Sequence, residues 1–572
     1  MPKSLEPSPE AVAESPAPRK GPLHPFLKSR KFAYIVLLGV ALLRAYVGRY
    51  SINADGMCYL DLGNAFFHRK WFDALNAYWS PLYAWLVGAA LFVLKPSHRA
   101  EFPVVHAMNV LIFIGALLCL EYFLAALNED TERELLAPEA APLSPWLVRT
   151  MGYALFLWAS MELITIWDIG ADLCVSGFVF LIAGMLVRLR TRNSSGFYLL
   201  LGAVLAFAYF TKAVMFPLGF AFILIGLWLV RPPESRLRYL LIVTFSFLMF
   251  SSPWIALLSH AKGRFTFSDT GLIAYSAFVS PGGNVMNWRG QPPGSGVPKH
   301  PTRKILDDPA VYEFATPVGG TFPPSFDPSY WDDTRSWTFS LRAQLLALKR
   351  HFRLYAGLFL RDQPGALTAA LTLLLLGGAA TRSAIARNWP LIAMCVTPLG
   401  LYALVYSEPR YVAGYVVLFW AVIFAGVRLH GSQQILAQYL VLAAVVTVIL
   451  SVADGTVRSI EARGPYSARE HVDVADGLER IGITSGDRVA VLGDGNWSYW
   501  AELDKVKIIT STEEGEAAVF WSEPRVQRER VYRAFASTGA KAVVGVGPLK
   551  NDAEEGWRRI GNTNHYVKIL TP

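Results

Sequence analysis

The stretch FAYIVLLGVALLRAYV, residues 32–47, is predominantly apolar and directly follows the basic residues Lys28, Arg30 and Lys31. About 20 mostly apolar residues suffice to cross a bilayer as a helix, and flanking Lys and Arg stay on the cytoplasmic side. No small-residue cleavage site follows the run, so we expect a retained transmembrane helix and not a signal peptide. Residues 1–31 are rich in Pro, Ser, Ala, Glu and Lys, which predicts a disordered cytoplasmic tail.

Similar apolar runs recur along the chain as far as Leu450. Hydrophobic residues make up 53% of the 572 residues and charged residues only 17%, and the mean hydropathy is +0.34. Soluble domains carry about a quarter charged residues, so this excess of apolar residues needs a bilayer to cover it. We predict a mainly α protein: a polytopic transmembrane helical bundle over residues 32–452.

The orientation of this bundle depends on one short apolar run, Pro81–Leu94, in the predicted first outer loop, residues 49–102. If this run lies on the membrane surface, the basic loops all become cytoplasmic, as the positive-inside rule expects. We therefore predict an interfacial helix, with Trp79, Tyr83 and Trp85 near the headgroups, and about eleven spans in total. The basic loops are Arg188–Arg192, Arg231–Arg238, Arg382–Arg387 and Arg428–His430.

Two long segments then lie outside the cytoplasm, residues 260–362 and residues 453–572. The first is rich in Trp, Tyr, Pro and Gly, so it is either a loop that covers a substrate or a poorly ordered linker. The second alternates short β-runs with helical patterns, which predicts a small extracytoplasmic α/β domain. Its turn at Gly493, Asp494 and Gly495 lacks the rest of a dinucleotide fingerprint and is interpreted as a plain strand-to-helix turn.

The first candidate for chemistry is Asp55, which follows the first helix in the sequence INADGMCYLD, residues 52–61. A carboxylate beside Gly56 at the membrane boundary is placed to meet a substrate that arrives in the lipid, and Asp55 is the leading candidate for a general base. The alternative is an ordinary helix cap or a solvated loop acid.

The predicted topology brings Asp168 and Asp172 to the same face of the membrane. They are four residues apart and would share one side of a continuing helix. An ionisable group near membrane depth is by default a functional hypothesis. One of the two is expected to cap the following helix, and Asp172 is the favoured functional acid.

Two cations complete the candidate set. Lys212 stands between apolar helical segments at the outer end of a predicted span, where it either snorkels to the interface or holds a lipid phosphate. Arg410, followed by Tyr411, reaches the same face. A guanidinium can bind phosphate in bidentate fashion, but Arg410 could equally anchor the interface or pair with Glu408.

At this point the sequence resembles the multi-spanning C-type glycosyltransferases that use polyprenyl-phosphate sugars, particularly bacterial relatives of protein mannosyltransferases and aminoarabinose transferases. The matching features, in chain order, are Asp55-Gly56 with Tyr59, the Asp168 to Asp172 segment, Thr211-Lys212 and Pro409-Arg410-Tyr411. The resemblance implies transfer of a sugar from a polyprenyl-phosphate donor to an acceptor hydroxyl or amine on the outer face. The acceptor would be a lipid, a glycan or a protein.

By this resemblance Asp55 would be the general base, and Lys212 and Arg410 would hold the donor phosphate. Asp172 joins the catalytic candidates, and Tyr411, Tyr59 and Asp168 join the substrate-binding ones. Many relatives have a second acid directly after the first-loop aspartate, where this chain has Gly56. A divalent metal held by such an acidic pair is therefore not supported, and the role of Asp61 stays open.

Charge and cysteine spacing bear on other classes of protein. The net charge of +9 is interpreted as basic residues that anchor cytoplasmic loops, so no nucleic-acid partner is predicted. The cysteines, which are Cys58, Cys119, Cys174 and Cys395, show no metal-ligand spacing. A transporter or flippase of lipid-linked saccharides and a non-catalytic envelope assembly protein remain as alternatives. The expected location is a bacterial inner membrane.

Overall fold

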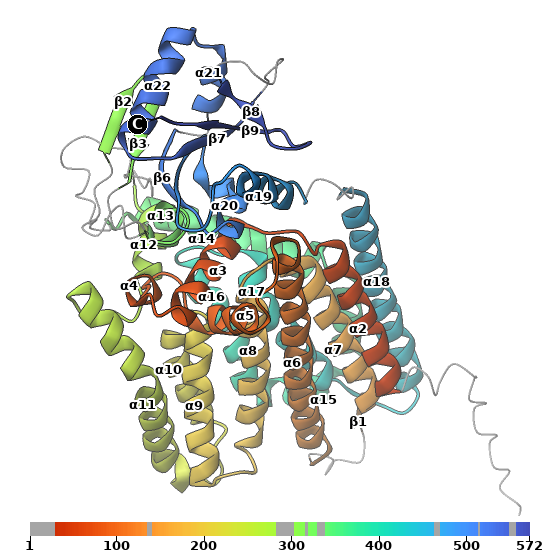
Figure 1. The fold of residues 1–572 in the computed structure, drawn as a ribbon. Coiled ribbons are helices and arrows are strands. Elements are labelled where there is room, and N and C mark those ends of the chain that lie inside the picture. Colours follow the sequence, from red (N-terminus) through yellow and green to blue (C-terminus); the bar gives the residue numbers. More distant parts are fainter. Residues whose placement is uncertain are drawn as a thin grey trace, which may run out of the picture.

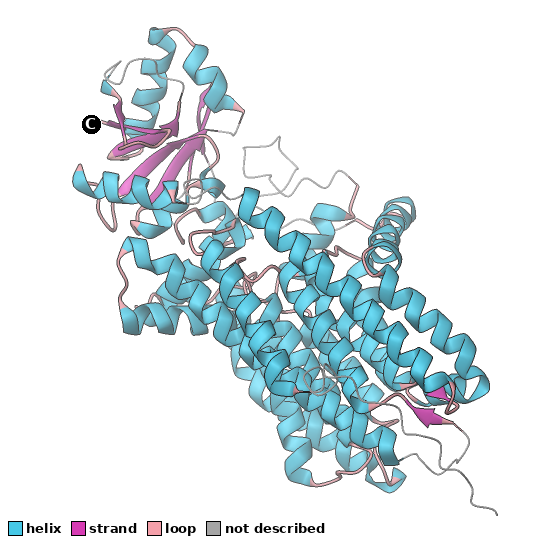
Figure 2. Cartoon of the chain, turned by 90° about the vertical axis from the view of Figure 1, so that its right-hand side faces the viewer, coloured by secondary structure: helices cyan, strands magenta, loops and turns pink. Residues whose placement is uncertain are grey.

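The computed structural model describes residues 29–133, 140–281, 303–314, 319–328, 338–462, 469–512, 515–547 and 556–571. Residues 1–28 of the predicted tail, and parts of the predicted 260–362 loop, lie outside these ranges. The described chain is mainly helical, as predicted. A bundle of long helices forms one end of the molecule and a β-sheet lies at the opposite end (Figures 1 and 2).

The bundle is formed by the apolar segments recognised in the sequence. Its helices are α2 (Arg30–Val47), α6 (His98–Arg133), α7 (Pro145–Trp158), α8 (Asp172–Arg188), α9 (Ser195–Thr211), α10 (Met215–Gly226), α11 (Arg236–Lys262), α15 (Pro364–Arg387), α16 (Trp389–Ala403), α17 (Pro409–Ala425) and α18 (Gln433–Ala462). Among the described residues, four segments are long and apolar enough to cross a membrane, those that contain α6, α11, α15 and α18, and several shorter apolar helices accompany them. The chain is an integral membrane protein, and the count of about eleven spans stays a prediction.

Short helices cover the end of the bundle that faces the sheet. They are α3 (Ala54–Phe67), α4 (Trp71–Ala74), α5 (Pro81–Leu94), α12 (Thr270–Phe278), α13 (Pro323–Phe326) and α14 (Leu341–Ala356). Helix α5 has the bounds of the predicted interfacial helix, and its place at the bilayer surface stays a prediction. A Cβ on Gly63 of α3 would lie 2.8 Å from the carbonyl oxygen of Ala84 in α5. The close crossing that glycine permits therefore fixes α3 against α5.

The sheet contains strands from both predicted outer segments. In the order β2-β3-β6-β5-β7-β9-β8, the three central strands β6, β5 and β7 are parallel and their neighbours antiparallel. The strands are β2 (Arg303–Asp307), β3 (Ala310–Glu313), β5 (Arg488–Leu492), β6 (Lys507–Thr512), β7 (Ala542–Val546), β8 (Arg558–Arg559) and β9 (His565–Ile569). Their helices are α19 (Glu470–Arg480), α20 (Tyr499–Leu503), α21 (Glu516–Ser522) and α22 (Arg525–Ser537). A separate pair, β1 (Ala141–Pro142) and β4 (Arg428–Leu429), lies at the opposite end of the bundle.

The sheet domain and the covering helices share one hydrophobic core. Met57 of α3, Tyr83 of α5 and Trp500 of α20 are all buried in the same cluster. A polar contact adds to it, because Lys505 lies 2.7 Å from Glu101 at the start of α6. The sheet domain therefore holds α3, and with it Asp55, in a defined position over the bundle.

Candidate active site

A cavity of about 610 Å³ lies among α3, α8, α10, α12, α16, α17 and the segment that follows α9. Of the residues predicted from sequence, Asp55, Tyr59, Asp172, Lys212, Arg410 and Tyr411 line it. Within the described residues, Asp168 is not part of this lining. In this cavity, carboxylates and cations from distant parts of the chain meet beside an apolar wall.

Asp55 belongs to the first turn of α3 but does not cap it. The side chain of Asn53 fills the cap position and accepts a hydrogen bond from the backbone N–H of Gly56 at 2.8 Å. Asp55 is thereby free to project into the cavity, where its Oδ2 accepts a hydrogen bond from Nη2 of Arg410 at 2.8 Å.

Gly56 is required by the close approach of the first turn of α3 to the segment that precedes α8. A Cβ at this position would lie 2.7 Å from Cβ of Ile169 and 2.7 Å from Oδ1 of Asn53. No larger side chain fits there without moving one of these segments. The absence of a second acid after Asp55 thus has a steric reason in this chain.

The expectation that Asp168 and Asp172 share one side of a continuing helix is wrong. Helix α8 begins at Asp172, while Asp168 lies in the preceding turn. The backbone N–H of Asp168 donates a hydrogen bond to the carbonyl of Thr165 and closes that turn. The carbonyl of Asp168 accepts a hydrogen bond from Asn109. Only Asp172, which is buried, reaches the cavity.

Lys212 follows the last residue of α9 and points at Asp172. Its Nζ lies 2.5 Å from Oδ1 of Asp172 and 3.4 Å from the centre of the Tyr411 ring. A lysine that snorkels would turn its ammonium to the membrane surface. Here the charge is held inside the cavity by a carboxylate and an aromatic face.

Arg410 is the centre of the charged cluster. Besides its bond to Asp55, its Nε lies 2.6 Å from Oε2 of Glu408 and 3.7 Å from Oδ2 of Asp172. The local pair with Glu408 is therefore present and coexists with long-range contacts to Asp55 and Asp172, whereas phosphate binding by Arg410 stays a prediction. Three carboxylates face two cations, Arg410 and Lys212.

The sequence indicates Glu408 only as a local partner of Arg410, and the structure places it in the lining of the cavity as well. Tyr406 donates a hydrogen bond to Oε1 of Glu408 at 2.9 Å, which orients this carboxylate toward Arg410. Tyr78, which was not recognised in the sequence, also lines the cavity, and burial raises the pKa of its hydroxyl, so it stays a neutral hydrogen-bond donor. The sequence feature that points to Glu408 is its position two residues before Arg410, within reach of an ion pair with that residue.

The open role of Asp61 is structural. Its carboxylate is buried and accepts hydrogen bonds from the backbone N–H of Thr321 at 2.7 Å and from the Thr321 hydroxyl at 2.8 Å. It ties α3 to the segment before α13. Among the described residues, no group of three or more His, Cys, Asp or Glu side chains is placed to hold a metal ion.

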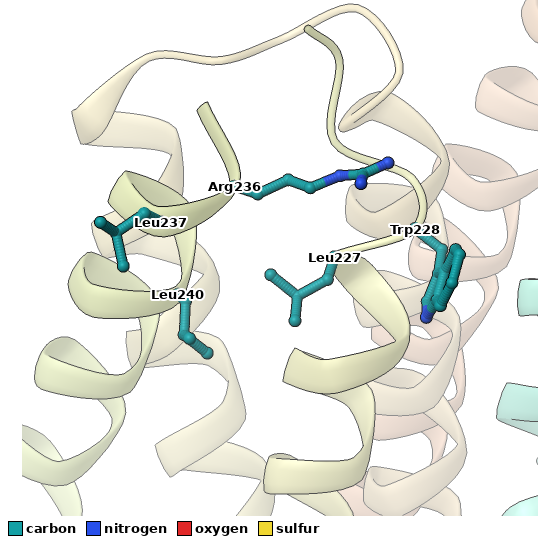
Figure 3. Close-up of a pocket in the computed structure, with 5 residues that line it drawn as sticks. All are labelled: Leu227, Trp228, Arg236, Leu237 and Leu240. Atoms are coloured by element: carbon teal, nitrogen blue, oxygen red, sulfur yellow. The ribbon is translucent and has the colours of Figure 1, made fainter. Parts of the chain in front are cut away.

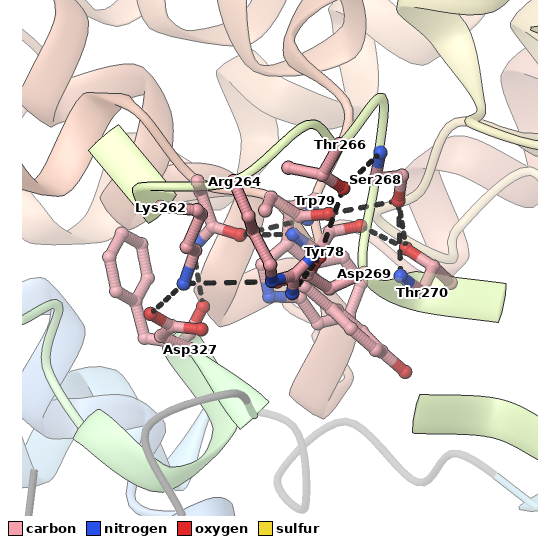
Figure 4. Close-up of polar contacts among 12 residues, drawn as sticks. Tyr78, Trp79, Lys262, Arg264, Thr266, Ser268, Asp269, Thr270 and Asp327 are labelled. Carbon is pink, nitrogen blue, oxygen red and sulfur yellow. Dashed lines mark hydrogen bonds and ion pairs between the residues drawn. The ribbon is translucent and has the colours of Figure 1, made fainter. Parts of the chain in front are cut away.

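A polar network fixes one wall of the cavity (Figure 4). Asp269 is buried and accepts hydrogen bonds from Thr266 at 3.0 Å and from Arg264 at 2.7 Å. Next to it, the Thr270 hydroxyl donates to the carbonyl of Tyr78 at 2.7 Å. Since Thr270 and Tyr78 both line the cavity, this network joins two loops into one wall.

A second hollow, of about 290 Å³, differs in kind from this cavity. Leu227, Trp228, Arg236, Leu237 and Leu240 line it, at the junction of α10 and α11 (Figure 3). It contains one cation and no carboxylate. It therefore offers no acid or base for catalysis.

The fold around this cavity is similar to the fold of a solved structure of the kind that the sequence resemblance predicted. One solved structure with this fold is ArnT from Cupriavidus metallidurans in the apo state, with a TM-score of 0.52 and 12% identity over 95% of this chain and 99% of that chain. ArnT bound to undecaprenyl phosphate gives a TM-score of 0.44 and 13% sequence identity, and the match covers 95% of this chain and 99% of the ArnT chain. The oligosaccharyltransferase of Archaeoglobus fulgidus, tethered to an acceptor peptide, gives a TM-score of 0.47 and 11% sequence identity. That match covers 90% of this chain and 70% of the oligosaccharyltransferase chain. No protein-family model and no curated protein matches the chain.

Proposed function

We propose that the protein is a membrane glycosyltransferase that transfers a sugar from a polyprenyl-phosphate donor to an acceptor at the outer face of the membrane. The observation that carries this proposal is the cavity in which a carboxylate on a helix start, Asp55, lies beside two cations suited to a phosphate, Lys212 and Arg410. The fold likeness to ArnT supports the same class.

The donor phosphate takes the place of a carboxylate at Arg410. In the structure Arg410 is shared by Glu408 and Asp55, and Lys212 is held by Asp172. Because both cations already have carboxylate partners, a phosphate that binds Arg410 would compete with those carboxylates. A phosphate that binds Nη2 of Arg410 would release Asp55, so donor binding would itself supply the free base.

The released Asp55 then removes the proton from the acceptor hydroxyl or amine. The acceptor atom forms a bond to C1 of the sugar, while the bond from C1 to the phosphate oxygen breaks, and polyprenyl phosphate leaves with one more negative charge. Lys212 and Arg410 stabilise that charge where it develops. A single displacement of this kind inverts the anomeric centre.

The proposed orientation follows from the basic loops and from the site. With the N-terminus in the cytoplasm of a bacterial cell, the cavity and the sheet domain lie on the extracytoplasmic side of the plasma membrane. The start of α8, the end of α9 and the start of α17 all contribute to the cavity, which supports one common face for these helix ends.

Sugar transfer from radiolabelled polyprenyl-phosphate sugars in proteoliposomes tests the proposal. Replacing Asp55 by Asn keeps the size of the side chain and removes the base, so we expect transfer to fall by roughly 10²- to 10⁴-fold with donor binding retained. Asp454→Asn is the matched control, because Asp454 is an exposed acid paired with Arg458 near the end of α18. Unchanged turnover in the Asp55→Asn protein would refute the catalytic assignment.

The same proteoliposomes separate the alternatives. A transporter would move the labelled lipid across the bilayer without forming a new glycosidic bond, and an assembly protein would do neither. The charged groups gather at one end of the bundle, whereas transporter sites lie near the bilayer midplane. Transport without transfer would overturn the proposed function.

A further inference from the structure

Helix α14 carries a basic face that the proposed reaction does not use. Its sequence, LRAQLLALKRHFRLYA, contains Arg342, Lys349, Arg350 and Arg353 and no acidic residue. All four basic side chains are exposed. At 100° per residue, Arg342, Lys349 and Arg353 fall within roughly 40° of one another and form one stripe along the helix.

Large apolar side chains flank this stripe on one side. Leu341 is 64% exposed, Leu345 is 56% exposed and Phe352 is 73% exposed. On the helix they lie roughly 60° to 100° from Arg342. A helix with an exposed apolar edge beside a basic stripe has the form of one that lies in a membrane interface, with apolar groups in the acyl chains and cations among the phosphates.

The opposite face of α14 is fixed to the end of α16. His351 is buried, and its Nδ1 lies 2.8 Å from the carbonyl oxygen of Ala403. Gln344 donates to the carbonyl of Leu404 at 2.9 Å, and Tyr355 donates to that of Leu399 at 2.9 Å. The orientation of the basic stripe is therefore determined by packing.

These contacts also place α14 at the cavity end of the bundle. The residues that follow its anchor points on α16, among them Val405 and Tyr406, line the cavity. A short π-helical segment, Gly357–Arg361, joins α14 to α15, which is one of the candidate membrane spans. Helix α14 thus lies at the cavity end of the bundle and comes shortly before a candidate membrane span in the chain (Figure 1).

We propose that the basic stripe of α14 binds the phosphate groups of anionic phospholipids in the leaflet that borders the cavity. The charge complementarity is complete, since the helix offers cations only, and the apolar edge fits the acyl region next to those headgroups. The lipid contact would hold α14, and through His351 the Val405–Tyr406 wall, at a fixed depth. This inference does not depend on the sugar chemistry.

Native mass spectrometry of the purified full chain tests it, with dioleoylphosphatidylglycerol as the probe and dioleoylphosphatidylcholine as the neutral reference. Each basic side chain near an anionic lipid surface contributes about fivefold to affinity, so the triple variant Arg342→Gln, Lys349→Gln, Arg353→Gln should bind phosphatidylglycerol about a hundredfold more weakly. Phosphatidylcholine binding should not change. Raising the salt concentration should weaken only the phosphatidylglycerol complex.

Two further variants make the test specific. Arg525→Gln, Arg530→Gln, Arg533→Gln removes the same charge from exposed positions on α22, in the sheet domain, and should leave lipid affinity unchanged. Arg342→Lys with Arg353→Lys keeps the charge and should keep the affinity. Unchanged phosphatidylglycerol binding in the α14 triple variant would overturn the proposal, as would an equal loss in the α22 variant. If the unmodified protein were a dimer and only the α14 triple variant were monomeric, with lipid affinity unchanged, this face would bind a second copy of the chain instead.

Discussion

Replacing Arg410 by Gln removes the charge that three carboxylates share. Arg410 lies 2.8 Å from Asp55, 2.6 Å from Glu408 and 3.7 Å from Asp172, and its side chain is 18% exposed. Breaking a buried ion pair by removing one partner costs about 3 to 5 kcal/mol. Because Arg410 is partly exposed, we expect the free energy of unfolding to fall by about 3 kcal/mol, the lower end of this range.

The same change should weaken donor binding. A hydrogen bond to a charged group contributes about 1.5 to 3 kcal/mol, which corresponds to a roughly ten- to hundredfold change in the dissociation constant. Titration of a polyprenyl-phosphate sugar into the detergent-solubilised protein measures this constant, and thermal unfolding of the same samples measures the stability loss.

Arg361→Gln provides the control for this experiment. Arg361 also pairs with a carboxylate, at 3.0 Å from Asp362, but its side chain is 83% exposed. Exposed pairs contribute about 0 to 1 kcal/mol, so this variant should unfold and bind donor much as the unmodified protein does. If Arg410→Gln behaved like Arg361→Gln in both measurements, the assignment of Arg410 to the donor phosphate would be wrong.

Three other perturbations address single features of the structure. Lys212→Met keeps an unbranched stem and removes the charge beside Asp172, so donor affinity should drop about tenfold or more in the same titration. Gly56→Ala places a Cβ 2.7 Å from Ile169 and should lower the free energy of unfolding by about 1 to 3 kcal/mol, whereas Gly39→Ala, with nothing within 4 Å, should be neutral or stabilising. Burial raises the pKa of Asp504 in the sheet domain to about 8. Between about pH 4 and pH 8 the folded state therefore keeps a proton that the unfolded state releases, so the free energy of unfolding should fall as the pH rises through this range. Unfolding temperatures across this range should lose that slope in Asp504→Asn, and an unchanged slope would exclude Asp504 as its source.

Much of the architecture was accessible from local sequence patterns. Apolar runs report which helices are buried or lie in lipid, and Pro81–Leu94 was found with the bounds that α5 has. Short β-runs predicted strands in the C-terminal segment, where β5 and β7 lie. These signals suffice to locate helices and strands because each pattern depends on the polarity of residues that are close in the sequence.

The sequence by itself also determined which charged residues stand at apolar helix ends, and so proposed Asp55, Lys212 and Arg410 as a set. Only the tertiary structure decided how they pair. Asp55 and Arg410 are separated by 355 residues, and no local pattern encodes a contact across that distance. The choice between Asp168 and Asp172 likewise depended on where α8 begins against its neighbours. Local periodicity determines the elements, whereas the steric fit between distant segments, such as Gly56 against Ile169, determines which side chains meet in the cavity.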